Sequence, residues 1–191
     1  MRTVSPADIR LGVTAGDEEQ LRHIASTLRR ATPEETLGAI SSRLQSITIP
    51  SNEAYYSSPL RGRRKSTEML TPRSSWGCSS HAQVACHLAR ACNIPAILVK
   101  SLDLGWISSA RVDAKMASGH VFVEVLLDGR PVLWDPQAIG GRLHKDYNSE
   151  TTVIEGKRIY DKGDPDELTL SHHGPEWEAE TARLFPPAAS D

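Results

Sequence analysis

Residues 121–134 read VFVEVLLDGRPVLW, two apolar runs separated by Asp128-Gly129. An Asp-Gly pair between apolar runs is a strong signal for a β-hairpin with a two-residue turn. With that turn, Asp135 faces Phe122, and His120 lies on the same face as Phe122 because side chains alternate along a strand. His120 and Asp135 are then diagonal neighbours, roughly 7 to 8 Å apart between backbones. A bulge at Gly129 would instead turn Asp135 to the opposite face.

A helix is predicted from Cys78 to Cys92, with Ala82, Ala85 and Ala89 on one stripe and a stop at Asn93 and Pro95. Cys78 falls in the middle of that stripe, so its thiol should point inward. The unpaired N–H groups and the dipole of a first helical turn favour thiolate and lower a thiol pKa from about 8.5. This is a suitable position for a nucleophile.

Cys78, His120 and Asp135 together have the residue types of a catalytic triad. His120 would take the thiol proton and return it to the leaving group, while Asp135 would fix the imidazole tautomer. Backbone N–H groups around Cys78 would stabilise the oxyanion.

Four segments resemble the transglutaminase-like superfamily: WGCSSHA at 76–82, LARACNIPA at 88–96, GHVFVEV at 119–125 and WDP at 134–136. The resemblance covers roughly residues 35–140. It implies an α+β, papain-like fold with helices packed on an antiparallel sheet, Cys78 as nucleophile, His120 as base and Asp135 as orienting acid. Asn93 replaces a usual Gly and Gln137 a usual Thr. Gly77 stands where animal crosslinking enzymes carry Gln, so the resemblance leaves the second oxyanion donor undefined.

Such a triad serves several reactions. Water would resolve the thioester in a peptidase, amidase or protein-glutamine deamidase, whereas an amine would resolve it in a crosslinking acyltransferase. Hydrolysis is favoured because the short chain shows no extra domain that would shield a thioester from water. A noncatalytic binding module that grips an acidic partner through residues 61–65 is the remaining alternative.

The length of 191 residues predicts a single domain over 1–191. Helices are expected within 17–48, capped by Asp17 and by Thr32 ahead of Pro33. Residues 50–75 and 103–118 are predicted to be loops, and a hairpin and a helix are expected within 150–185.

The net charge of −2 excludes the basic surplus that nucleic-acid binding requires. No apolar run approaches the roughly 20 residues that span a bilayer, and the N-terminus lacks a signal-peptide core. The three cysteines suit a reducing compartment. The expectation is a cytoplasmic protein that acts on a protein or peptide without nucleic acid or membrane, and its oligomeric state is left open.

The remaining polar and aromatic residues receive lesser roles. Cys86 and Cys92 are predicted to be packing residues, and the scatter of Cys and His around one helix argues against a zinc site. No metal or organic cofactor is implied. Trp76 and Trp106 are candidate substrate-binding walls, and His81 is expected to be a cleft-wall or surface group. Three assignments complete this set: His144 and His172-His173 as loop residues, and Glu124 as an exposed strand residue or a second polar group in the cleft.

Overall fold

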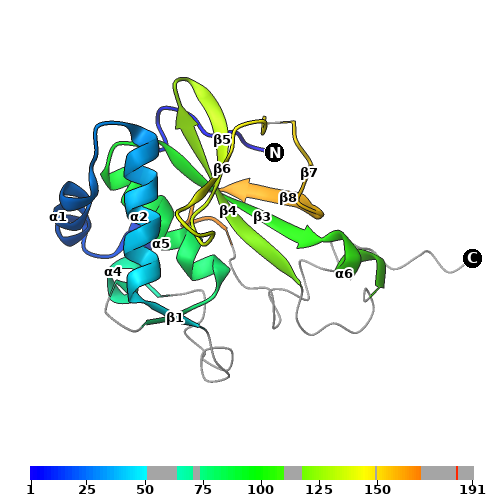
Figure 1. Ribbon diagram of the computed structural model, residues 1–191, viewed down its shortest axis with the longest axis horizontal. Helices are drawn as coiled ribbons and strands as arrows, with labels where there is room; N and C mark the ends of the chain where they lie inside the picture. The colour runs from blue at the N-terminus through cyan, green and yellow to red at the C-terminus, as the bar shows by residue number, and fades with distance from the viewer. Residues whose placement is uncertain (51–63, 71–73, 110–117, 149, 169–183, 185–191) are drawn as a thin grey trace, which may run out of the picture.

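The computed structural model describes residues 1–50, 64–70, 74–109, 118–148, 150–168 and 184. Helices α1 (Glu18–Leu28), α2 (Pro33–Ile47) and α5 (Cys78–Ala91) gather on one side of a curled sheet (Figure 1). Among the described residues, no helix is both long and apolar enough to cross a membrane.

The main sheet has six strands in the order β6-β5-β4-β3-β8-β7, and every neighbouring pair is antiparallel. Its strands are β3 (Ala96–Asp103), β4 (Gly119–Leu127), β5 (Arg130–Asp135), β6 (Arg142–His144), β7 (Val153–Ile154) and β8 (Lys157–Gly163). Two short strands, β1 (Thr48–Pro50) and β2 (Ser74–Trp76), form a separate parallel pair. The strand β2 ends two residues before Cys78, so this small sheet leads the chain into α5.

The helix boundaries follow the predicted capping signals. Asp17 accepts a hydrogen bond from the Gln20 N–H at 3.0 Å, which caps α1. Thr32 and Glu35 bond reciprocally to each other's backbone N–H at 3.2 and 3.1 Å, a capping box that starts α2. Asn93 adopts a left-handed φ of 65° after α5. Short polar side chains fix these ends locally, which is why the sequence could predict them.

The hairpin of β4 and β5 has the predicted two-residue turn. Asp128 and Gly129 have φ values of 49° and 74°, and Leu127 pairs with Arg130. The register continues without a bulge to the pairing of Val123 with Trp134. Asp135 therefore lies on the face predicted for it. The turn at Glu155-Gly156, between β7 and β8, has the same left-handed pair of φ values, 47° and 71°.

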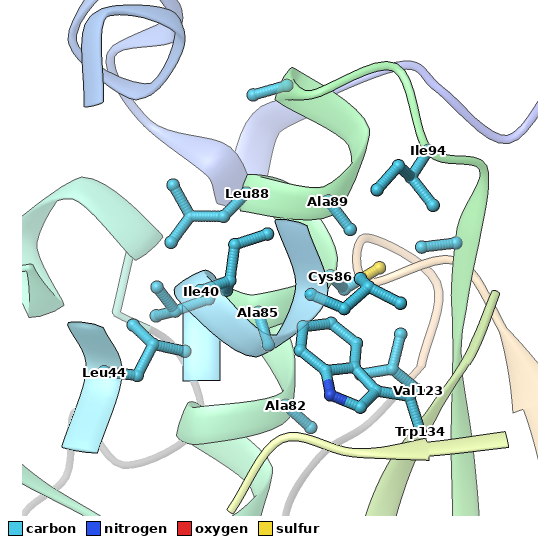
Figure 2. Close-up of a cluster of buried hydrophobic side chains, with 14 of the residues drawn as sticks. Ile40, Leu44, Ala82, Ala85, Cys86, Leu88, Ala89, Ile94, Val123 and Trp134 are labelled. Carbon is cyan, nitrogen blue, oxygen red and sulfur yellow. The ribbon is translucent and has the colours of Figure 1, made fainter. Parts of the chain in front are cut away.

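The sheet separates two apolar clusters. Helix α5 packs its small residues Ala82, Ala85 and Ala89 toward Val123 and Trp134 in the larger cluster (Figure 2). The opposite face of the sheet carries a smaller cluster: Val99, Phe122, Leu133, Tyr147 and Ile159. Because side chains alternate along β4, His120 shares the face of Phe122, and it lies at the end of the strand near the start of α5.

Ion pairing joins the two edges of the curled sheet. Arg142 on edge strand β6 pairs with Glu155 in the turn that follows edge strand β7. His144, also on β6, lies 4.0 Å from the same carboxylate. The sheet therefore curls far enough to bring its first and last strands into contact.

Three segments that the sequence assigned to loops contain regular structure. Helix α6 (Leu104–Ser109) occupies part of 103–118, α4 (Ser66–Met69) lies within 50–75, and β2 begins there at Ser74 and ends at Trp76. His144 belongs to β6 and is not a loop residue. A short 3-10 helix, η1 (Val13–Ala15), precedes α1. These segments are three to six residues long, too short for a periodic pattern. Three predictions fall outside the described residues: the basic residues 61–63, the loop residues His172-His173, and the helix from Gly174 to Leu184, of which only Leu184 is described.

Glu124 is not an exposed strand residue, because its side chain is completely buried. Its carboxylate accepts hydrogen bonds from Lys162 Nζ at 2.9 Å, from the Val4 N–H at 2.7 Å and from the Tyr147 hydroxyl. Lys162 lies on β8, 38 residues away in the chain. This ion pair explains how the sheet accommodates a carboxylate between apolar residues.

Replacing Lys162 with Met is expected to destabilise the fold by about 3 to 5 kcal/mol, because it leaves the Glu124 carboxylate buried without its cation. Urea unfolding followed by circular dichroism measures the change. The double variant Lys162→Met, Glu124→Gln should lose less than the single variant. Lys145→Met, which removes an exposed pair with Glu34, is the control and should leave unfolding unchanged. Equal stabilities for Lys162→Met and Lys145→Met would contradict the prediction.

Candidate active site

Cys78 is the first residue of α5 and follows the N-cap residue Gly77. The first helical hydrogen bond runs from the His81 N–H to the Gly77 carbonyl at 3.1 Å. The N–H groups of Cys78 and Ser79 precede that bond in the first turn, where the helix itself supplies no acceptor. The half-buried Cys78 side chain thus lies beside backbone N–H donors and packs against the larger apolar cluster.

The surroundings of Cys78 favour its thiolate. Burial raises the pKa of the thiol, but a hydrogen bond and the charge of His120, the Val121 N–H and the Ser79 side chain outweigh burial. The pKa of Cys78 is therefore lowered from its ordinary value. A lowered pKa in a contact with imidazole is the environment of a reactive cysteine.

His120 lies between Cys78 and Asp135. Its Nε2 is 3.1 Å from Asp135 Oδ1, and its ring meets the Phe122 ring edge-on with centroids 4.6 Å apart. Because Nε2 faces the carboxylate, Nδ1 is the nitrogen that remains for the thiol. Burial lowers the pKa of His120, but the contacts with Asp135 and Cys78 outweigh it and raise the pKa to about 9. His120 is thus a cation at neutral pH, paired with the Asp135 carboxylate on one side and in contact with the Cys78 sulfur on the other.

Asp135 is held in place by the turn that follows it. Its Oδ1 accepts the N–H groups of Gln137 and Ala138 at 3.0 and 3.3 Å. From α2, Gln45 Nε2 donates to the Ala138 carbonyl at 2.6 Å and anchors the same turn. Burial raises the pKa of Asp135, but His120 and these two N–H groups lower it below its ordinary value. The carboxylate stays ionised and oriented toward His120.

Gly119 positions His120 through a close contact between backbones. A Cβ built at Gly119 would lie 2.2 Å from the Ser101 carbonyl oxygen on the neighbouring strand β3. The Ser101 hydroxyl also donates to the His120 carbonyl at 2.9 Å. Only glycine lets β4 approach β3 this closely, so the sequence Gly119-His120 has a structural cause.

Gly119→Ala is expected to slow alkylation of Cys78 by iodoacetamide about tenfold or more, because the added methyl group moves His120 away from the thiol. Mass spectrometry of the alkylated cysteine peptide at pH 6 measures the rate. Gly105→Ala is the matched control, since nothing lies within 4 Å of a Cβ there. An unchanged rate in a folded Gly119→Ala protein would show that His120 tolerates the shift.

The other predicted residues have mixed outcomes. Trp76 lies on β2, and its side chain is outside the described part of the structure. Trp106 is half-buried on α6, directly after β3, and its role in substrate binding stays a prediction. Cys86 is a core residue as predicted, and burial raises its pKa to about 12. Cys92 is half-buried, and burial likewise raises its pKa.

His81 is not a surface group, because its side chain is buried beside the candidate triad. Sequence reasoning also missed Gly119 and Gln45 as residues that position His120 and Asp135. The Gly-His pair itself was the available signal for Gly119. Gln45 carried no signal, since its contact depends on how α2 packs against the turn after β5.

A metal centre receives no support from side-chain placement. Within the described ranges, no three or more His, Cys, Asp or Glu side chains are grouped so that they could hold an ion.

The arrangement of Cys78, His120 and Asp135 suits nucleophilic attack by a thiolate with proton transfer through imidazole.

Comparison with known proteins places the fold. Among solved structures, the chain resembles a candidate cysteine protease from Cytophaga hutchinsonii, with a TM-score of 0.55 and 13% identity over 84% of this chain and 48% of that chain. It also matches the periplasmic domain of TgpA from Pseudomonas aeruginosa, with a TM-score of 0.47 and 18% identity over 66% of this chain and 44% of that chain.

The chain therefore spans about half the length of each of these structures. No protein-family model and no curated protein match the sequence. At 13% identity the likeness to the candidate protease establishes the fold alone, and the chain has the predicted α+β fold, with helices packed on an antiparallel sheet and Cys78 at a helix N-terminus.

Proposed function

We propose that the chain is a thiol-dependent hydrolase of amide bonds in proteins or peptides, with Cys78 as nucleophile, His120 as general acid and base, and Asp135 as orienting carboxylate. A peptidase, an amidase and a protein-glutamine deamidase all fall within this reaction class. The name of the Cytophaga hutchinsonii protein, a candidate cysteine protease, supports the same class.

One observation carries the proposal. The thiol at the start of α5 contacts His120, whose Nε2 lies 3.1 Å from Asp135. The three groups come from a helix and two strands, and their mutual contacts lower the thiol pKa and raise the imidazole pKa. A merely structural cysteine in an apolar core has the opposite shift, as Cys86 does.

The reaction follows from these positions. The Cys78 thiolate attacks the amide carbon, and the electron pair of the carbonyl moves to its oxygen, where N–H groups at the start of α5 stabilise the anion. His120 then gives the proton on Nδ1 to the leaving nitrogen, the C–N bond breaks, and a thioester remains on Cys78. Water attacks the thioester as His120 takes its proton, and the carboxylic acid leaves with the thiolate restored.

Asp135 keeps the imidazolium stable through both steps. Its carboxylate faces Nε2, so Nδ1 is the nitrogen that exchanges protons with the thiol, the leaving group and water. The turn that holds Asp135 therefore maintains the tautomer as well as the position of the ring.

A product assay tests hydrolysis against transfer. The protein is incubated with a pool of glutamine-containing peptides, with and without a fluorescent primary amine, and ammonia, new amino termini and incorporated amine are measured. Hydrolysis predicts ammonia or new termini that exceed incorporated amine, and all products should be absent with Cys78→Ala. Amine incorporation that outpaces hydrolysis would identify an acyltransferase. No product in any arm, together with an unactivated thiol, would favour a binding module.

A further inference from the structure

Helix α2 lies directly against the turn 136–141, which follows Asp135 and leads into β6. Ser41 and Gln45 are four residues apart on α2, so they share one face of the helix. A Cβ built at Gly141 would lie only 2.3 Å from Ser41 Oγ, and the φ of Gly141 is left-handed, at 75°. The backbone of the turn is therefore packed against this face of α2.

Gln45 supplies the hydrogen bond between α2 and this turn. Its Nε2 donates to the Ala138 carbonyl at 2.6 Å and lies 3.5 Å from the Gln137 carbonyl oxygen. The Ala138 carbonyl also accepts the Gly141 N–H at 2.8 Å, which closes the turn on itself. The side chain of Ile139 is 99% exposed, so it does not hold the turn in place. The contact with Gln45 is thus the polar link that fixes the turn to a neighbouring element.

The residues that accept from Gln45 are the residues that hold the Asp135 carboxylate. Gln137 and Ala138 accept through their carbonyl oxygens, and their N–H groups donate to Asp135 Oδ1 at 3.0 and 3.3 Å. The Gln137 carbonyl and the Ala138 N–H belong to one planar peptide group. A donor on the carbonyl side of a peptide group polarises it and strengthens its N–H as a donor. Gln45 therefore supports the carboxylate through both the position and the polarity of the turn.

We propose that Gln45 is a positioning residue of the candidate triad, through which α2 holds the Asp135 carboxylate 3.1 Å from His120 Nε2. The inference rests on the proposed function, because that function gives Asp135 its orienting role. Gln45 bonds the backbone of the turn, so its effect reaches His120 only through Asp135. Helix α2 is then a fourth element of the active site, in addition to α5, β4 and β5.

Gln45→Met tests the hydrogen bond, because methionine has a similar length but no N–H donor. The titration of the His120 ring is followed by nuclear magnetic resonance of its nitrogens. Gln20→Met is the matched control, since Gln20 is an exposed glutamine on α1. Both Gln45→Met and Gln20→Met are also combined with Asp135→Asn, which removes the carboxylate through which Gln45 is proposed to act.

Gln45→Met is expected to lower the His120 midpoint by about one pH unit, because the carboxylate that stabilises the imidazolium is held less closely. Gln20→Met should leave the midpoint unchanged. In the Asp135→Asn background, Gln45→Met should cause no further shift, since two residues that act along one path are not additive. An unchanged midpoint in folded Gln45→Met would overturn the inference. A further shift of equal size in the Asp135→Asn background would also overturn it, because Gln45 would then act without Asp135.

Hydrogen exchange of the side-chain amides tests the unsubstituted protein. The Gln45 amide protons should exchange with water about tenfold or more slowly than those of Gln20, because the Gln45 amide is bonded to the turn. Equal exchange would overturn the inference even if every variant failed to fold.

The same titration separates this inference from the proposed function, because it needs no substrate. A wild-type His120 that titrates near its ordinary value of 6.5 would count against the triad itself, and this inference would fail with it. A raised wild-type midpoint that Gln45→Met leaves unchanged would count against Gln45 alone.

Discussion

Cys78→Ala is expected to lose about a thousandfold or more of any amide hydrolysis, because no second group at the start of α5 can form the thioester. Alkylation at pH 6 should also disappear, since Cys78 is the cysteine whose pKa is lowered. Peptide cleavage, ammonia release and mass spectrometry of the labelled protein measure the two losses.

Cys92→Ala provides the control for this experiment. Cys92 is half-buried, as Cys78 is, but burial raises its pKa and its sulfur donates to the Ala25 carbonyl at 3.6 Å. This variant should keep both hydrolysis and low-pH alkylation. Cys78 would not be the nucleophile if hydrolysis persisted in Cys78→Ala, or if alkylation at pH 6 were lost in Cys92→Ala.

His120→Ala is expected to lower hydrolysis by about 10² to 10⁴-fold, the usual contribution of a positioned acid and base. The thiol should also lose its activation, because His120 supplies both the hydrogen bond and the charge that lower the Cys78 pKa. In alkylation against pH, the midpoint should move upward to that of an ordinary cysteine or beyond it, because burial then acts on the thiol without His120 to oppose it. An identical pH profile in His120→Ala and wild type would show that His120 does not activate the Cys78 thiol.

The pH dependence of the wild-type protein follows from the same contacts. Rising pH first converts the Cys78 thiol to thiolate, so activity rises through a midpoint below that of a free cysteine. His120 loses its proton at about 9, so donation to the leaving group fails and hydrolysis falls above that pH. The two midpoints belong to the coupled pair. Asp135→Asn should bring the falling limb to lower pH, because it removes the carboxylate that raises the His120 pKa.

Local chemistry made much of this structure predictable. Asp17, Thr32 and Asn93 set helix ends through their own side chains or backbone preferences, and Asp128-Gly129 set a hairpin register through left-handed φ values. That register placed Asp135 on the same face as His120 before any tertiary contact was known. The thiol position followed from the helix period alone.

Contacts between distant segments could not be predicted in this way. Lys162 neutralises Glu124 across 38 residues, and nothing near Glu124 in the sequence indicates its partner. The burial of His81 could not be predicted, because it depends on how α5 packs against the end of β5. Helix α6 was missed because six residues provide less than two turns of pattern. In each case the deciding interaction is made only when separate elements pack.

The candidate triad is assembled from two such elements. His120 and Asp135 come from one hairpin, 15 residues apart in the chain, whereas Cys78 lies on a helix and precedes His120 by 42 residues. A chain in which the hairpin has formed but α5 has not packed against it would still have a Cys78 thiol with an ordinary pKa. The lowered pKa of Cys78 thus depends on the native packing of α5 against the hairpin, and an unfolded chain has an ordinary cysteine thiol at this position.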